Sequence, residues 1–589
     1  MVAVTVGARK ITRGPGGQID VADQGAIERL EDRLTIDGGC ERIGSPSLST
    51  VGVAASLAPL LALAACSGDG TGQTGGPAPA TSPSSSNISA VQASRFLAQT
   101  TFGATKATIA EVQSQGFDGW LTAQFGLARE TTHWDWLVAN GYNATANINN
   151  DTGFDPVMWR QMIVARDQLR QRVGIALLEI LAIGIGGVQV NWRQFAMAAY
   201  VDVLMDNAFG NFRTILDKIT TNAAMASFVT FLDNRKANSA TGSVPDENYA
   251  RELMQLYTIG PSQLNMDGTP RLSAGVPIET YTQDDVTGLA RVFTGLTLAN
   301  SDSSKPDRYR LPLVMNASTN ETGASSFLGT GTSGGGFGAI KVALDTIFAH
   351  ANMPPFISKQ LIQRLVTSNP SPAYVARVAS AFADNGSGVR GDMKAVIRAI
   401  LLDSEARADA SLATMSTGKL REPVMRLTGW ARAFRATFIG NTALGDTSSN
   451  STRLAQSMGR SPTVFNFFRP GYAPPNTAIA SGGLVAPEFQ ITSELSVVAY
   501  INFMQGLISN GTSDLKADYA DMLALANDST ALLDDINLVL AAGQLSSATL
   551  AAIKAAIDSI SASATNGSTN RVYTAILLTM ASPDYLILK

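Results

Sequence analysis

The chain of 589 residues is poor in histidine and cysteine, with only two of each. The histidines are His133 and His350, so a zinc site with three histidine ligands is excluded. Cys40 and Cys66 lie near the start of the chain and cannot form a disulfide framework for the rest of it. The sequence therefore identifies no metal site and no cofactor.

Long basic runs and familiar catalytic motifs are also missing. Lys and Arg number 44 against 48 Asp and Glu, and no Lys/Arg-rich stripe interrupts this balance, so nucleic acid is not an expected partner. The chain has no P-loop, no HExxH helix and no G-x-S-x-G in a strand-turn-helix setting. The stretch "GTGTSGGG" lacks the lysine of a phosphate cradle and reads as a loop.

What the chain does contain is a long helical pattern. Apolar residues recur at spacings of three and four in stretches such as "MWRQMIVARDQLRQRVGIALLEILAIGIG" and "ATLAAIKAAIDSI". We therefore predict a mainly α fold, a large multi-helix body over residues 88–589. A Gly-rich loop or short hairpin is expected near 300–337, and a helix break at 369–372, where Ser371 caps the second helix.

An apolar run at Val51–Ala65 ends at Cys66 and is typical of a bacterial lipoprotein signal. It has the length of a signal h-region and is too short to span a bilayer. Cleavage before Cys66 and acylation of its thiol would anchor the protein to a membrane of the cell envelope, and Ser67 favours the outer membrane. The alternative is a buried apolar helix that follows an N-terminal extension.

The segments on either side of this run have different interpretations. Residues 1–50 are too long for a signal n-region and carry seven acidic against six basic residues, so we expect the true start near Arg42 and regard residues 1–50 as a doubtful extension. Cys40 would then be absent from the mature chain. Residues 66–87 are rich in Gly, Ser, Thr and Pro and predict a flexible tether.

The stretch "SVPDENYARELMQLYTIG" concentrates polar groups on one predicted helix. Glu247, Asn248, Arg251 and Glu252 fall on its solvent-facing arc, together with Gln255 and Thr258. Glu247 and Arg251 have the spacing of a helical ion pair. Glu247 and Glu252 diverge by about 140° around the helix axis, so their carboxylates cannot both point at one substrate bond. Loss of Arg251 is expected to cost about 1–3 kcal/mol if its partners are buried.

If the helix belongs to a catalytic site, a second carboxylate or a base must come from another part of the chain, and Asp285 and His350 are the candidates. In that reading Glu252, Asp285 and His350 supply acid/base chemistry while Asn248 and Arg251 bind the substrate. Structural readings compete with it. Asp284 and Asp285 follow Thr282 at a helix start, where acids stabilise free N–H groups, and His350 ends a helix, where it can cap the turn or meet the dipole.

Two further residues, Arg421 and Glu422, precede Pro423 and are interpreted as ion-pairing and capping groups. His133 lies among tryptophans in "TTHWDWL" and is interpreted as a packed aromatic residue.

Several segments in order resemble a bacterial family, domain of unknown function 1800. They are "ASRFLAQTTFGAT", "RDQLRQRVGIALLEIL", "PDENYARELMQLYTIG", "YTQDDVTGLARVFTG", "FISKQLIQRLVTSNPSPAYVARVA", "RGDMKAVIRAILLDSEAR", "GKLREPVMRL", "SPTVFNFFRPGY" and "GLVAPEFQI". The resemblance covers roughly residues 91–589. It implies a large, helical and often exported protein, commonly encoded beside an exported sulfatase-like protein, and it implies no reaction.

The chain departs from this family at two places. "QLYTIG" has Tyr257 where many relatives resemble "ELHTLG", and "NASTNETGASSFLG" lacks the His-Asp pair that many carry before "FLG". A reaction that used those histidines is therefore in doubt here. We expect an exported, lipid-anchored, non-catalytic binding or accessory protein for an exported partner; the alternative is a hydrolase or lyase acting on an envelope polymer such as a polysaccharide.

Overall fold

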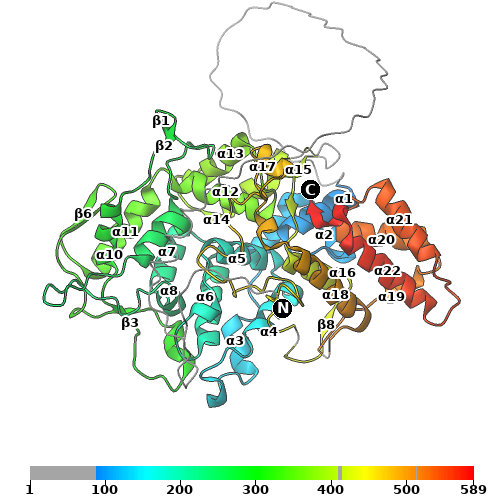
Figure 1. The fold of residues 1–589 in the computed structure, drawn as a ribbon, viewed down its shortest axis with the longest axis horizontal. Coiled ribbons are helices and arrows are strands. Elements are labelled where there is room, and N and C mark those ends of the chain that lie inside the picture. Colours follow the sequence, from blue (N-terminus) through cyan, green and yellow to red (C-terminus); the bar gives the residue numbers. More distant parts are fainter. Residues whose placement is uncertain (1–87, 409–413, 415, 443, 513) are drawn as a thin grey trace, which may run out of the picture. The chain divides into compact units, whose positions relative to one another are not determined.

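Helices dominate the computed structural model, which describes residues 88–589 except 409–413, 415, 443 and 513 (Figure 1). The mainly α prediction is confirmed. The predicted leader, Cys66 and the tether lie outside the described residues. The α-helices are α1 Ala90–Thr100, α2 Lys106–Gly126, α3 His133–Ala139, α4 Phe154–Val164, α5 Gln168–Ile180, α6 Arg193–Asn207, α7 Phe212–Thr220, α8 Ala223–Phe228, α9 Asn248–Glu252, α10 Gln283–Val292, α11 Gly336–Ala349, α12 Met353–Leu365, α13 Pro372–Ala383, α14 Met393–Leu402, α15 Ser404–Arg407, α16 Pro423–Ala433, α17 Ala478–Ser481, α18 Glu494–Asn510, α19 Ala520–Ala524, α20 Ser529–Ala541, α21 Ser547–Asp558, α22 Gly567–Ala581 and α23 Pro583–Leu586.

The strands are short and form antiparallel pairs. The pairs are β1 Leu272–Ser273 with β2 Val276–Pro277, β3 Leu296–Thr297 with β4 Val314–Met315, β5 Ser325–Phe327 with β6 Thr330–Thr332, β7 Lys419–Leu420 with β10 Ile587–Leu588, and β8 Thr437–Phe438 with β9 Leu515–Lys516. The β5–β6 hairpin lies inside the loop that separates α10 from α11, so the expected hairpin near 300–337 is confirmed.

Helix α5 lies at the centre of the body and packs against α1, α2, α4, α6 and α12 (Figure 1). Every residue of α5 except Arg170 is buried. A helix that is buried on all sides has no solvent face for its polar side chains. Arg172 and Glu179 are therefore carried into the interior, where their charges must find partners.

The break between α12 and α13 follows the local sequence closely. Ser371 accepts a hydrogen bond from the Tyr374 N–H, and Pro372 occupies the first helical position. Both are favourable at a helix start, because Ser fills a free donor and Pro has no N–H to lose. The predicted break and cap are confirmed.

The C-terminal region forms a helical group in which α18, α19, α20 and α21 pack against α22 (Figure 1). The chain then returns to the centre through α23, and β10 pairs with β7 so that Leu588 faces Lys419. The last strand therefore pairs with β7, which lies more than two hundred residues after α5 in the sequence. None of the described helices has the length and hydropathy needed to cross a membrane.

Candidate functional site

Helix α9 begins the polar segment singled out in the sequence, but it does not continue as an α-helix. Residues Leu253–Thr258 form a π-helical segment, η5, in which the Ile259 N–H donates to the Met254 carbonyl five residues back. The wider turn changes the direction of later side chains. Thr258, predicted on the solvent arc, is fully buried. The inward positions are confirmed for Tyr249, Ala250, Leu253, Met254 and Tyr257, while Leu256 is half-buried.

The predicted Glu247–Arg251 ion pair is present, with 3.0 Å between Arg251 Nη2 and Glu247 Oε2. Gln283 and Thr287 of α10 also donate to Glu247, each at 2.8 Å. Arg251 thus contributes to a half-exposed polar contact between α9 and α10, and its partners are not buried. Asn248 donates to Thr230 at 3.3 Å and so is engaged with a different loop.

Glu252 was expected on the exposed arc and is instead buried, with 9% of its surface exposed. Its Oε2 has no hydrogen-bond donor. Burial raises the pKa of Glu252, and the Arg251 charge only partly opposes this. Burial raises the pKa values of Tyr257 and Tyr281, and the Glu252 charge acts in the same direction, so both phenols lie in the neighbourhood of this carboxyl group.

Asp285 serves the start of α10. Its Oδ2 accepts from the Thr282 N–H at 2.7 Å and from the Thr282 hydroxyl, and its Oδ1 accepts from the Leu328 N–H at 2.6 Å. Burial acts to raise the pKa of Asp285, but these hydrogen bonds outweigh it and lower the pKa. The geometry matches the capping interpretation of the sequence.

His350 lies between α11 and α12. Its Nδ1 accepts from the Asn352 N–H at 3.1 Å, so the ring caps the turn that leads into α12. Burial and the nearby Arg390 charge both lower the pKa of His350. A neutral ring suits the capping role and does not carry the charge needed to meet a helix dipole.

Asp285 and His350 hydrogen-bond to different parts of the chain, whereas Glu252 Oε2 has no donor. No hydrogen bond or ion pair between described residues joins any two of Glu252, Asp285 and His350. Their common acid/base role stays a prediction. His133 is buried and its Nδ1 lies 2.8 Å from Asp202, which also accepts from the first N–H groups of α3, so this histidine is part of a structural contact.

The structure contains a buried group of charged residues, the central charge cluster, that was not predicted from the sequence. It consists of Arg172, Glu179, Arg364, Lys419, Glu422 and Glu488, each no more than 4% exposed. Lys419 Nζ lies 3.0 Å from Glu488 Oε1 and 3.4 Å from Glu422 Oε1. The Arg364 carbonyl accepts from Lys419 and from Arg172, at 2.9 and 2.6 Å. The cluster joins α5, α12, β7, the start of α16 and the helical turn η8 Pro487–Ile491.

Glu179 and Glu422 carry different protonation states within this cluster. Burial raises the pKa of Glu179 well above its usual range, and the Glu422 charge raises it further. Burial also acts to raise the pKa of Glu422, but the Lys419, Arg172 and Arg364 charges lower it to about 2. Glu422 is thus held in its ionised form, whereas the environment of Glu179 favours the neutral acid.

Glu422 does not cap α16 with its side chain, so that part of the capping interpretation is wrong. Its Oε2 accepts from Gln456 at 2.7 Å, and Arg421 lies over the Tyr585 ring rather than pairing with an acid. A signal was present in the sequence. Arg172 and Glu179 stand seven residues apart with no polar side chain between them, and a helix without a polar face is buried.

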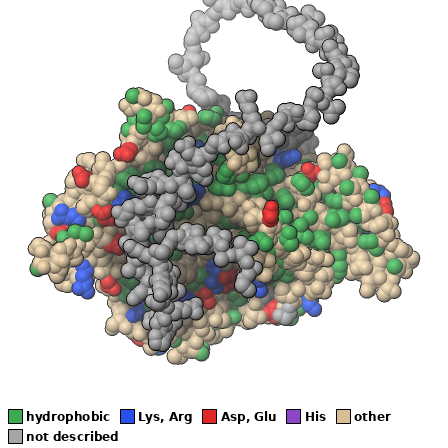
Figure 2. Space-filling model, in the orientation of Figure 1, with side chains coloured by type: hydrophobic (Ala, Val, Ile, Leu, Met, Phe, Trp, Pro, Cys, Tyr) green, Lys and Arg blue, Asp and Glu red, His purple; other side chains and the backbone are tan. Residues whose placement is uncertain are grey.

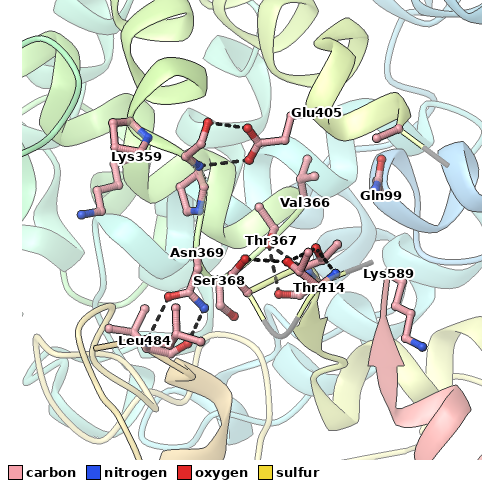
Figure 3. A pocket seen from close by; sticks show the side chains of 18 of the residues that line it. Gln99, Lys359, Val366, Thr367, Ser368, Asn369, Glu405, Thr414, Leu484 and Lys589 are labelled. Atoms are coloured by element: carbon pink, nitrogen blue, oxygen red, sulfur yellow. Dashed lines mark hydrogen bonds between the residues drawn. The ribbon is translucent and has the colours of Figure 1, made fainter. Parts of the chain in front are cut away.

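A cavity of about 550 Å³, the donor pocket, is lined by residues of several helices and loops (Figure 3). It is bounded by the end of α12, the start of α13, α1, the residues before β7 and the loop at Leu484. Asn369 exchanges two hydrogen bonds with the Val485 backbone and so holds the last of these loops in place. A second cavity of about 30 Å³ touches Arg172, Lys419, Arg421 and Glu422 and has room for one water molecule.

The polar groups of the donor pocket are mostly hydrogen-bond donors. Lys359, Ser368 and Gln99 line it, and Lys589 lies at its lower right in Figure 3. Its one described acidic residue is Glu405, whose two oxygens accept from the Ser371 N–H and hydroxyl. No pair of free acid and base groups is available among the described lining residues.

Residues 95–587 match the model of a protein family described as "Protein of unknown function (DUF1800)". The chain belongs to this family. The match includes the central charge cluster and all of the donor pocket except Lys589, and it begins after Cys66. No curated protein and no solved structure matches the chain. Membership of DUF1800 therefore establishes which family the chain belongs to, and the family description assigns no activity.

Proposed function

We propose that this DUF1800 protein is an exported lipoprotein, anchored through Cys66 in the cell envelope, that binds a ligand and has no catalytic role. The ligand is an envelope polymer or a segment of an exported partner such as a sulfatase-like protein encoded nearby. The apolar run before Cys66 and the Gly/Ser/Pro-rich residues 66–87 support the anchor.

The donor pocket is the observation that carries the binding proposal. Its volume of about 550 Å³ is typical of ligand sites. Its only described carboxylate already accepts two hydrogen bonds, so the pocket offers no free acid/base pair for hydrolysis. Glu252, Asp285 and His350 do not line it.

Capture from intact envelope tests this function. The tagged full chain is expected to recover a defined partner or polymer, and Leu484→Trp, which places an indole at the pocket rim, is expected to abolish recovery. Leu523→Trp is the matched control, because Leu523 is exposed on α19, away from the pocket. Recovery of nothing by the unaltered chain, or equal recovery by both variants, contradicts the proposal.

The anchor is tested separately. Cys66→Ala is expected to move the protein from the membrane fraction to the soluble fraction and to abolish incorporation of labelled fatty acid. Membrane association that is unchanged in this variant contradicts anchoring at Cys66.

A hydrolase or lyase acting on an envelope polysaccharide is the second candidate. It is favoured by Glu252, because a carboxyl group with a raised pKa suits a general acid. Glu252→Gln is then expected to abolish turnover of the polymer with little change in melting temperature. Turnover that persists in this variant excludes Glu252 as the acid.

A further inference from the structure

The wall of the donor pocket contains two buried polar groups that have no hydrogen-bond partner. Gln99 is fully buried and its Nε2 has no acceptor, and Ser368 is 3% exposed and its Oγ has no partner. Both residues line the pocket (Figure 3). An unsatisfied buried donor costs about 1–3 kcal/mol, so such groups are expected where a ligand supplies the missing acceptor.

The orientation of the Gln99 amide is fixed from behind by Arg407. The Arg407 guanidinium donates to Gln99 Oε1, which leaves Nε2 as the free end of the amide. Arg407 itself lies over the Phe96 and Phe117 rings, at 5.0 and 5.3 Å, and forms no ion pair with a described residue. Burial and the Arg95 charge lower the pKa of Arg407 to about 9.

Positive charge also reaches the pocket from its other sides. Lys359 of α12 lines it, and neither Lys359 nor Lys589 forms an ion pair with any residue in the described part of the chain. Asp267 acts on Lys359 from a distance, but its Oδ1 already accepts two hydrogen bonds from Thr269. The side chains at the pocket wall that have unused hydrogen-bond donors therefore include two ammonium groups, a buried amide N–H and a buried hydroxyl.

This set of groups discriminates between ligand classes. A neutral sugar is usually held by aromatic faces and by acceptors as well as donors, and no aromatic side chain is among the described lining residues. An anionic oxygen group accepts several hydrogen bonds at once and gains from the surrounding positive charge. The hydroxyls of Thr414, Ser416 and Thr417 border the same pocket and suit the hydroxyls of a saccharide.

We propose that the donor pocket binds the anionic group of an acidic saccharide, a carboxylate or a sulfate or phosphate ester, between Lys359, Ser368 and Gln99. This proposal rests on the proposed binding function and names its ligand class. The saccharide is a part of the envelope polymer that the protein captures.

Calorimetric titration of the purified full chain tests the ligand class with four probes at one ionic strength: D-glucuronate, inorganic sulfate, D-glucose and a hexaglutamate peptide. We expect D-glucuronate and sulfate to bind, D-glucose not to bind, and hexaglutamate to bind more weakly than D-glucuronate. D-glucose that binds as tightly as D-glucuronate overturns the proposal. Hexaglutamate that binds while D-glucuronate does not overturns the saccharide assignment.

Two serines give a matched pair of variants. Ser368→Ala removes a buried hydroxyl without a partner and is expected to weaken D-glucuronate binding about three- to tenfold with no loss of thermal stability. Ser358→Ala removes another buried, unpartnered hydroxyl that does not line the pocket, and is expected to leave binding unchanged. Equal effects of the two variants overturn the proposal.

Lys359→Met adds a charge test, with Lys394→Met on α14 as its control. The first variant is expected to weaken binding at least tenfold and to reduce its salt dependence, and the control to change neither. If the anionic probes fail while Leu484→Trp still abolishes capture from envelope, the ligand class is wrong and the binding function stands. If capture fails as well, both proposals are wrong.

Discussion

Glu179 and Glu422 are both buried in the protein interior, yet their pKa values move in opposite directions. Both carboxyl groups lose hydration, but Glu422 lies beside the Lys419 ammonium while Glu179 is 3.8 Å from its nearest cation, Arg364. The ionised form is therefore stabilised at one residue only. The pair keeps a single negative charge between two buried acids.

The first prediction compares the two acids. Glu422→Gln removes the charge that pairs with Lys419 and is expected to lower the free energy of unfolding by about 3–5 kcal/mol at neutral pH. Glu179→Gln is expected to cost much less, because glutamine resembles the neutral acid. Urea unfolding followed by circular dichroism measures both, and equal losses contradict the assigned protonation states.

The second prediction concerns pH. Because Glu422 has a lowered pKa, its contribution to stability is present above its ordinary pKa of 4.5 and is lost as pH falls toward about 2. Because Glu179 has a raised pKa, the cost of keeping it protonated grows as pH rises above 4.5. Glu179→Gln should therefore gain stability relative to the unaltered protein as pH rises above 4.5. A difference that does not change with pH contradicts this.

The third prediction is at Arg251. Its partners Glu247 and Gln283 are partly exposed, so Arg251→Ala is expected to cost about 0.2–0.5 kcal/mol, less than the buried network considered from the sequence. The melting temperature in low and high salt measures it. A loss above about 1 kcal/mol would show that the contact is more than a surface ion pair.

At the scale of elements, the change from α9 to η5 decides how the segment 248–258 meets the core. The π-helical turn brings Thr258 inside, where its hydroxyl donates to the Leu253 carbonyl. Tyr257 is fully buried and donates to the Ala182 carbonyl at 3.0 Å. Tyr257 thus joins η5 to Ala182, which follows α5.

The fourth prediction follows from that contact. Tyr257→Phe leaves the buried Ala182 carbonyl without this donor and is expected to lower the free energy of unfolding by about 1–3 kcal/mol. Tyr142→Phe is the control, because Tyr142 donates to the Asn441 carbonyl in an exposed setting where water can replace it. Equal and small effects would mean that the hydrogen bond of Tyr257 contributes little.

At the scale of the whole molecule, the C-terminal strand closes the interior. β10 pairs with β7 beside the central charge cluster, the Arg421 N–H donates to the Leu586 carbonyl at 2.7 Å, and Gln544 donates to the Ile587 carbonyl. Distant parts of the chain are thus joined at one place. The donor pocket and the central charge cluster lie on the two sides of Gly418–Lys419.

The fifth prediction is that removal of residues 587–589 exposes this region. We expect a lower urea midpoint and faster amide exchange at Lys419 and Leu420, because both the ladder and its cover are lost. Removal of Lys589 alone keeps both paired residues and is the control. Unchanged exchange in the longer truncation contradicts a covering role for β10.

The sequence by itself determined the elements whose signals are local. Helical periodicity, the Ser371 cap between Pro370 and Pro372, the helix start at Thr282 and the Glu247–Arg251 pair all involve residues a few positions apart, and each is present as predicted. The ordered motifs also identified the DUF1800 family. Local hydrogen bonds and helix geometry need no knowledge of distant contacts.

Only the tertiary structure decided which charges are buried together. Arg172, Arg364 and Glu422 are about 190 and 60 positions apart in the sequence, and nothing local distinguishes Glu422 from a solvated capping residue. The same applies to the burial of Glu252 and to the Gln99 Nε2 and Ser368 Oγ atoms, which lack partners at the wall of one pocket. Burial and electrostatic partners depend on how the helices pack together. These two properties determine the pKa values of the buried acids and which hydrogen-bond donors stay unpaired.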